Sequence, residues 1–164
     1  MQSVPQLFSQ QLFYGGSDID NACYNGNISR MKWNMMLNTF RHGYKFYYDD
    51  RDRLTEAKMV GYDFEEDSLQ YSERIGYDKN SNITQMVRTG VLNDSTITLD
   101  SLVYSHSGNR ITRIRDYGQS AAYSDIFELK SNPSRYYYYH NISGDMVYDS
   151  NKGIAKINYD YLGS

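Results

Sequence analysis

The sequence predicts an all-β fold made of consecutive antiparallel β-hairpins, and its composition is the first reason. The 164-residue chain contains 18 Tyr and 12 Gly but only 2 Pro, and Asp and Asn are frequent while Ala and Glu are scarce. Tyr and β-branched residues favour pleated strands, whereas Asp, Asn, Ser and Gly favour tight turns. Helical proteins rely on Ala and Glu at exposed positions. The composition therefore indicates many short strands joined by short turns.

A recurring turn motif is the second reason. Residues 48–55 and 77–84 share an aromatic residue, Asp, three polar residues, Arg or Asn, an aliphatic residue and Thr. Residues 140–147 keep this spacing with conservative replacements, and residues 106–112 and 24–29 are shortened versions. Self-similarity at a roughly constant period is typical of repeat architectures.

Each copy predicts one hairpin. Upstream residues alternate as they would on a strand, with Tyr44, Phe46 and Tyr48 on one face, and the alternation resumes downstream of each turn. The aliphatic residues lie 26 to 35 residues apart, which leaves room for one hairpin and a return loop. The motif residues expected to shape the hairpins are Tyr24, Asn27, Ile28, Tyr48, Asp49, Arg53, Leu54, Tyr77, Asp78, Asn82, Ile83, Asn109, Ile111, His140, Asp145 and Met146.

The remaining segments are interpreted in the same way. Residues 6–16 read as a strand that ends in a Gly-Gly turn, and residues 30–37 alternate as a strand although a short helix is conceivable there. Residues 61–69 and 118–134 are expected to be loops between units. Residues 153–164 alternate like a further strand. We expect residues 1–164 to form a single repeat module that belongs to a much longer protein.

Charge and hydropathy exclude several classes of function. Lys and Arg number 17 against 20 Asp and Glu, for a net charge of −3, which disfavours binding to nucleic acid phosphates. No apolar run approaches the roughly 20 residues that span a bilayer, and the first 30 residues lack the pattern of an export signal.

Residues with catalytic or metal-binding chemistry are sparse. The single cysteine, Cys23, cannot form an intramolecular bridge, and the three His are far apart in sequence. Residues 78–82 resemble the start of a calcium loop, but Ile83 and Thr89 stand where an EF-hand requires Gly and Glu, so a hydrogen-bonded turn is the preferred interpretation. We expect no catalytic residues, no metal and no cofactor.

The tyrosine run at residues 136–139 leaves two interpretations open. Aromatic rings can stack on carbohydrate, which would make Tyr137 and Tyr139 a ligand surface. Consecutive residues of a strand point to opposite faces, so the same run also supplies cross-strand packing to both faces. Packing is the preferred interpretation.

The repeated motif resembles the YD repeat of the RHS and teneurin family, and in particular RHS proteins of Bacteroides-type bacteria. The resemblance is carried by residues 24–33, 48–57, 77–84, 108–112 and 151–159. It implies that the hairpins align edge to edge into a curved, spiralling sheet that forms a hollow shell. In bacterial toxins of the family this shell encloses a C-terminal toxic or variable polypeptide, and in teneurins it forms a barrel. It also implies a secreted or cell-surface bacterial protein.

The leading functional hypothesis is therefore a non-catalytic structural module of such a shell. The Asp-Pro segment of the self-cleaving core in bacterial shells is missing from this sequence, so we expect no self-cleavage. The expected partners are the rest of the parent chain or an enclosed polypeptide, and a second copy through exposed strand edges. The alternative hypothesis is a surface that binds carbohydrate or protein through exposed Tyr.

Overall fold

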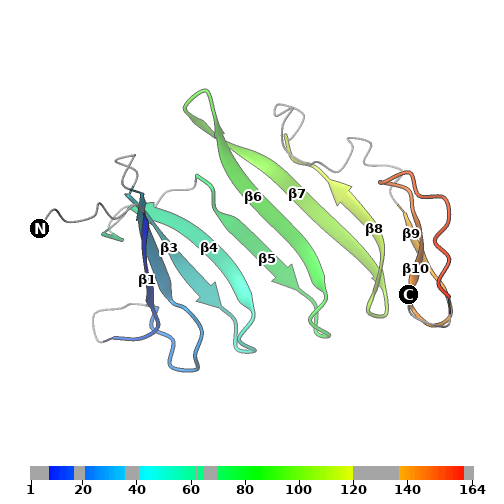
Figure 1. Cartoon of the computed structure of the whole chain (residues 1–164), viewed down its shortest axis with the longest axis horizontal. Helices are drawn as coiled ribbons and strands as arrows, with labels where there is room; N and C mark the ends of the chain where they lie inside the picture. Colours follow the sequence, from blue (N-terminus) through cyan, green and yellow to red (C-terminus); the bar gives the residue numbers. More distant parts are fainter. Residues whose placement is uncertain are drawn as a thin grey trace, which may run out of the picture. The chain divides into compact units, whose positions relative to one another are not determined.

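The computed structural model of the chain describes residues 8–16, 21–35, 41–61, 63–64, 70–119 and 137–160. Every regular element in these residues is a β-strand, which confirms the predicted all-β class (Figure 1). Within the same residues there is no helix with the length and apolarity needed to cross a membrane.

The described residues contain ten strands, which range from 3 residues in β9 to 13 in β7. They are β1 (Phe8–Phe13), β2 (Arg30–Met35), β3 (Arg41–Tyr48), β4 (Leu54–Gly61), β5 (Glu73–Tyr77), β6 (Ile83–Leu92), β7 (Ser95–Ser107), β8 (Arg110–Asp116), β9 (Tyr138–His140) and β10 (Met146–Asp149). Strands β1 to β8 form an eight-stranded sheet in chain order, and β9 pairs with β10. Among the described strands, the order starts at β1 and ends at β8 with no pairing between the two, so these strands form an open antiparallel meander.

Four of the predicted hairpins are confirmed. Each motif copy after the first joins two neighbouring strands, namely β3 to β4, β5 to β6, β7 to β8, and β9 to β10. The predicted aliphatic residues Leu54, Ile83 and Met146 are the first residues of the downstream strands, and Ile111 is the second residue of β8. The predicted strand at 30–37 corresponds to β2 over its described residues, and the one at 6–16 corresponds to β1 between Phe8 and Phe13.

The first motif copy, residues 24–29, was wrongly predicted to be a hairpin turn. Phe13 pairs directly with Arg30, so residues 14–29 form one long connection between β1 and β2, and Ile28 precedes β2. The Asn21 amide holds this connection in place by donating to the carbonyl oxygens of Ser29 and Phe46 at 2.9 and 3.0 Å.

The strand predicted for residues 153–164 is also wrong over its described part. Ile154 makes a single antiparallel bridge with Asp149, and residues 155–160 belong to no strand. This segment instead follows β10 through isolated bonds: the Ile157 N–H donates to the Val147 carbonyl at 2.9 Å, and the Tyr159 hydroxyl donates to the Met146 carbonyl at 2.8 Å. Residues 161–164 lie outside the described part.

A tight turn between β6 and β7 was not among the predicted hairpins. Asn93 and Asp94 both have positive φ, 49° and 60°. Two successive left-handed residues match the right-handed twist of the flanking strands, so two residues suffice to join them. The predicted loops at 61–69 and 118–134 lie mostly outside the described residues.

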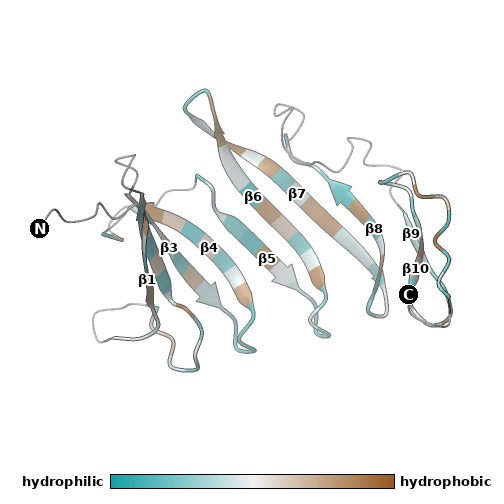
Figure 2. Cartoon of the chain, in the orientation of Figure 1, coloured by the Kyte–Doolittle hydropathy of each residue, from teal (hydrophilic) through white to brown (hydrophobic). Residues whose placement is uncertain are grey.

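The chain divides into two compact units. The first comprises Met1–Ile75 with Arg88–Ile97, and the second comprises Gly76–Val87 with Thr98–Ser164. Along the strands of both units, hydrophobic and hydrophilic residues follow one another in patches (Figure 2).

In the first unit, the cross-strand register gathers aromatic side chains on one face of the sheet. Trp33 lies opposite His42, and Phe46 opposite Ala57. The Trp33 and Tyr44 rings stack 5.7 Å apart at 15°, and the Tyr44 and Phe46 rings stack 5.9 Å apart at 22°. These contacts agree with the predicted alternation of Tyr44 and Phe46 and define an aromatic face.

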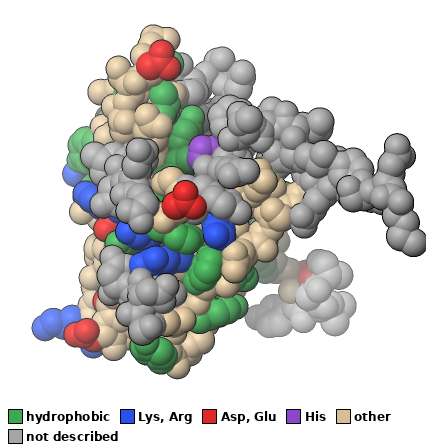
Figure 3. Space-filling model, turned by 90° about the vertical axis from the view of Figure 1, so that its left-hand side faces the viewer, with side chains coloured by type: hydrophobic (Ala, Val, Ile, Leu, Met, Phe, Trp, Pro, Cys, Tyr) green, Lys and Arg blue, Asp and Glu red, His purple; other side chains and the backbone are tan. Residues whose placement is uncertain are grey.

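The opposite face of the first unit combines a small apolar cluster with cations. Phe64 lies at an edge-to-face angle of 88° and 5.5 Å from Phe13, and Val60 on this face is only 1% exposed. Arg30 lies over the Phe64 ring and Lys32 over the Phe13 ring, at 5.2 and 5.5 Å from the ring centroids. Figure 3, a view from the left-hand side of Figure 1, shows Lys and Arg side chains next to hydrophobic ones.

The second unit is packed around Leu102 and Tyr138, both 8% exposed. Gly118 passes directly over the backbone of β7, where a Cβ atom would overlap the carbonyl group of Leu99. The Gly118 N–H donates to the Asp116 carboxylate at 2.8 Å, and the same carboxylate oxygen accepts from Ser101 N–H at 2.9 Å. The close approach therefore requires glycine at this position.

We predict that Gly118→Ala lowers the stability of the second unit by about 1–3 kcal/mol, since backbone and not a flexible side chain blocks the added methyl group. Urea unfolding followed by circular dichroism measures the change. Gly76→Ala is the matched control, because its Cβ would lie at ordinary contact distance, 3.5 Å from the nearest atom. Equal stability of the two variants would contradict the prediction.

Candidate functional site

The repeated turns are the most regular feature of the structure. In residues 49–53, Oδ1 of Asp49 accepts hydrogen bonds from the backbone N–H groups of Arg51 and Arg53 at 2.9 and 3.1 Å. The second oxygen, Oδ2, accepts from the Arg53 guanidinium at 2.8 Å through Nε. One carboxylate thus closes the turn through backbone and side-chain contacts together.

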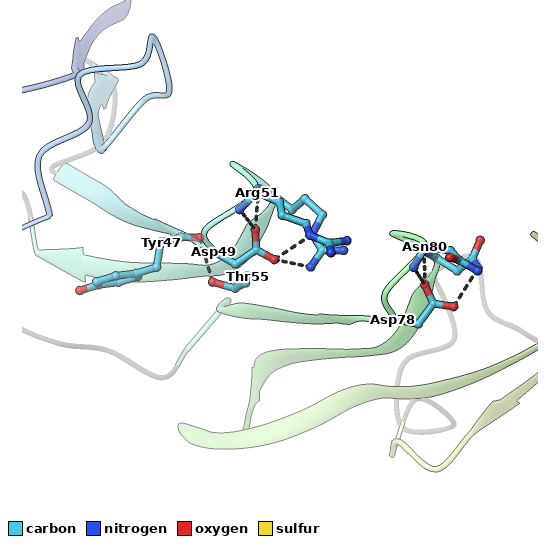
Figure 4. Close-up of polar contacts among 8 residues, drawn as sticks. Tyr47, Asp49, Arg51, Thr55, Asp78 and Asn80 are labelled. Atoms are coloured by element: carbon cyan, nitrogen blue, oxygen red, sulfur yellow. Dashed lines mark hydrogen bonds and ion pairs between the residues drawn. The ribbon is translucent and has the colours of Figure 1, made fainter.

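Residues 78–82 repeat this arrangement (Figure 4). Oδ1 of Asp78 accepts from the backbone N–H groups of Asn80 and Asn82 at 2.8 and 2.9 Å. Oδ2 accepts from the Asn82 amide at 2.8 Å. Because N–H donors surround both carboxylate oxygens, the geometry is that of a hydrogen-bonded turn and lends no support to the calcium-loop alternative.

In residues 141–145 the side chain of the first residue, Asn141, is the donor and that of the fifth, Asp145, is the acceptor, the reverse of the first two turns. The Asn141 amide oxygen accepts from the Asp145 backbone N–H at 2.9 Å, and the Asn141 amide nitrogen donates to the Asp145 carboxylate at 2.9 Å. The N–H of the fifth residue still donates to the side chain of the first, although the charged residue has moved from the first to the fifth position and the side-chain bond now runs from the first residue to the fifth.

The backbone of the three turns is also the same. In each, the N–H of the first residue donates to the carbonyl of the fifth, at 3.0, 2.9 and 2.9 Å, and the N–H of the fourth donates to the carbonyl of the first. The fourth residue has positive φ in every case: 60° at Asp52, 69° at Ser81 and 98° at Gly144. Asp, Ser and Gly are residues that turns tolerate in this conformation.

The carboxylates of the first two turns are held in their charged form. The Arg53 hydrogen bond is the main cause that lowers the pKa of Asp49 to about 2, with further contributions from backbone N–H groups. The pKa of Asp78 is also lowered, mainly by the hydrogen bond from Asn82. Hydrogen bonds to an ionised carboxylate favour ionisation.

A β-bulge follows the turn in three of the hairpins, namely β3–β4, β7–β8 and β9–β10. Tyr47 pairs with Glu56 but Tyr48 pairs with Leu54, which leaves Thr55 as the extra residue. Likewise Thr112 is extra between the pairs Ser105–Arg113 and His106–Ile111. Val147 takes this position in the last hairpin, between the pairs Met146–His140 and Tyr148–Tyr139.

The bulge explains why the motif contains Thr. The Thr55 hydroxyl donates to the Tyr47 carbonyl and the Thr112 hydroxyl to the Ser105 carbonyl, each at 3.1 Å. A bulge interrupts the ladder locally, and the Thr hydroxyl supplies a donor to a carbonyl beside the interruption. At Thr55 and Thr112 the sequence signal for the bulge was therefore present in the motif, but its role was not predicted.

Neighbouring turns are joined by side-chain bonds. The Asn25 amide donates to the Asp52 carboxylate, the Asn82 amide donates to the Gly108 carbonyl at 3.3 Å, and the Arg110 guanidinium donates to the carbonyls of Asn141 and Ile142 at 3.2 and 3.3 Å. The partners lie 26 to 32 residues apart, which is the spacing of the motif copies. These contacts, which we term turn links, connect one repeat to the next within each unit.

Comparisons with known proteins give no match: no family model, no curated protein and no solved structure is similar to this chain. The resemblance to YD repeats therefore depends on the motif itself.

The other predicted motif residues lie around these turns. Tyr48 donates its hydroxyl to the Ile28 carbonyl at 2.9 Å, and burial raises its pKa. Tyr24 is 84% exposed, and the Asn27 N–H donates to the Asn25 side chain at 3.1 Å. Tyr77 ends β5 and is half-buried. Asn109, in the short turn before β8, lies 3.4 Å from the Asn82 amide, and His140 pairs with Met146.

The structure separates the two tyrosines proposed as a ligand surface. The Arg113 guanidinium lies over the Tyr137 ring at 5.1 Å, in a contact between β8 and the start of the next hairpin. Tyr139 is 58% exposed and lies 5.2 Å from the Tyr148 ring. Among the described residues, no group of three or more His, Cys, Asp or Glu is placed to hold a metal ion.

We predict that the turns are interchangeable while their hydrogen-bond pattern is kept. Arg53→Asn reproduces the pair of residues 78–82, and the double variant Asp49→Asn/Arg53→Asp reproduces that of residues 141–145. Both should unfold in urea near the wild-type midpoint. Asp49→Ala removes the acceptor of the Arg51 and Arg53 N–H groups and of the Arg53 guanidinium, and it should unfold at clearly lower urea. A larger loss in Arg53→Asn than in Asp49→Ala would contradict this interpretation.

The lowered pKa of Asp49 predicts acid sensitivity. Because its pKa falls from an ordinary 3.8 to about 2 in the folded state, its stabilising contribution is complete above about pH 4 and is lost as the pH falls towards 2. The urea midpoint should therefore fall over this range, and less steeply in Asp49→Asn. Identical pH profiles of wild type and variant would rule out this role for Asp49.

Proposed function

We propose that the chain is a non-catalytic structural module of the RHS and YD-repeat type. Its hairpins would form part of a longer β-shell that encloses a C-terminal polypeptide or is displayed at a bacterial surface. The observation that carries the proposal is that the turns at residues 49–53, 78–82 and 141–145, each located between two paired strands, share the same two backbone hydrogen bonds.

The chemistry of these turns suits a structural role. Their carboxylates and amides are engaged in closing the turns and in the turn links, so these polar groups serve the fold. Repeats that contact only their neighbours gain stability from each added interface. Such a module can lengthen by adding hairpins without changing those already present.

The two faces of the first unit would suit the wall of a shell. One carries the stacked rings of Trp33, Tyr44 and Phe46, and the other carries Arg30 and Lys32 over Phe13 and Phe64. Faces of different chemistry can meet an enclosed chain on one side and solvent on the other.

Enclosure can be tested on the parent protein expressed from its whole coding region. Limited proteolysis should digest the polypeptide that follows the repeats slowly in the native protein and rapidly after the shell is opened by mild denaturant. A following polypeptide that is cleaved equally fast in both states would refute an enclosing role.

The edge strand β1 supports the proposed growth of the sheet. Among the described strands, β1 pairs with β2 alone. Its sequence, Phe-Ser-Gln-Gln-Leu-Phe, has no charge and no Pro, and Phe8 and Leu12 are 53% and 40% exposed. Natural edge strands usually carry Lys or Pro that block further pairing. An unprotected edge favours the addition of another strand.

We predict that the isolated chain dimerises through β1. An antiparallel pair centred on Gln10 would place Phe8 opposite Leu12 of the second copy and Gln10 opposite its own equivalent. Light scattering should then give twice the 19.1 kDa chain mass. Gln10→Lys and Gln10→Glu should each be monomeric, because like charges would face each other, and an equimolar mixture should dimerise again. Monomeric wild type, or dimeric single variants, would contradict the prediction.

A further inference from the structure

A hollow beside the last hairpin has the features of a small ligand site. It has a volume of about 480 Å³ and lies among β9, β10 and the segment that follows them. Its lining includes Tyr139, Asn141, Tyr148, Lys156, Asn158 and Tyr159. Ligand pockets in proteins typically measure about 300–1,000 Å³ and combine aromatic walls with a few polar groups.

The walls of the hollow are held in place by hydrogen bonds. Asp149 and Ile154 exchange backbone bonds at 3.0 and 2.9 Å, and the Ile157 N–H donates to the Val147 carbonyl at 2.9 Å. The Tyr159 hydroxyl is bonded to the Met146 carbonyl at 2.8 Å, which fixes its ring over β10. The site is therefore formed before any ligand arrives, which reduces the entropy cost of binding.

The aromatic walls remain accessible. Tyr139 is 58% exposed and Tyr159 is 55% exposed, although each contacts the hairpin. The rings of Tyr139 and Tyr148 are 5.2 Å apart and tilted by 49°, so they do not form a parallel slot for a flat aromatic ligand. An exposed tyrosine face bordered by amides instead fits a pyranose ring, which has an apolar face of C–H groups and hydroxyls around its edge.

The positive charge of the hollow favours a ligand that carries a negative charge. Lys156 is its single charged lining residue, and Asn158 adds an exposed amide. An ammonium group attracts a carboxylate, and it gives a neutral sugar no comparable advantage.

We propose that this hollow binds an acidic carbohydrate, with the Tyr139 and Tyr159 rings against the sugar and Lys156 against its carboxylate. Such a site is independent of the structural role proposed above, because none of these three side chains belongs to a turn pair. It also assigns the possible ligand surface to Tyr139 and to residues that follow β10, in place of Tyr137, whose ring lies against Arg113.

The test compares an oligogalacturonide with a neutral galacto-oligosaccharide of equal length by calorimetric titration. We expect the acidic probe to bind more tightly at low salt. Lys156→Gln should bring the acidic probe to the affinity of the neutral one. Tyr139→Ala should weaken both by at least about tenfold. Chemical shift changes on binding should concentrate between residues 139 and 159.

Tyr117→Ala is the matched control, since Tyr117 is 59% exposed and does not line the hollow. It should bind both probes as wild type does. The exposed Lys156→Gln change tests the site even if Tyr139→Ala impairs folding, which circular dichroism would reveal. Absence of binding to both probes, or equal losses in Tyr117→Ala and Tyr139→Ala, would overturn the proposal and leave the structural function unaffected.

Discussion

The structure depends on closing each full-length hairpin turn with a pair of side chains four residues apart. Among the described residues only Ala57, Val60, Leu102 and Tyr138 are buried hydrophobic side chains, so strand register cannot be fixed by deep packing alone. In residues 49–53, 78–82 and 141–145 a carboxylate or amide captures backbone N–H groups and the partner side chain together. The strands on either side then leave the turn in a defined register, and a bulge at Thr55 follows the first of these turns and one at Val147 the last.

The same geometry is achieved with three different residue pairs. Asp with Arg, Asp with Asn, and Asn with Asp all supply an acceptor for backbone N–H and a donor to the partner. What is kept between copies is therefore the arrangement of donors and acceptors, while residue identity and charge vary. Sequence similarity between such repeats can fade while the turn itself is retained. This is consistent with a chain whose repeats are recognised by comparing its own segments, although its sequence matches no family model.

The sequence could predict those features that are decided locally. Turn formers between alternating strands located four hairpins, and the first residues of β4, β6 and β10 coincide with the predicted Leu54, Ile83 and Met146. Features decided by distant contacts were missed. Residues 24–29 look like a turn, but Asn21 and Ser29 hold them in a long connection. Residues 155–160 alternate like a strand, yet they touch β10 through isolated bonds. The hollow at Tyr139 depends on that unpredicted path.

The turn links have a consequence for how the chain acquires its structure. Each joins residues 26 to 32 positions apart, and each strand of the meander pairs with its neighbours in sequence. A hairpin that emerges from the ribosome can thus complete its contacts with the previous hairpin before distant segments have been made. We expect assembly to proceed in the direction of synthesis, with each finished hairpin serving as the template for the next.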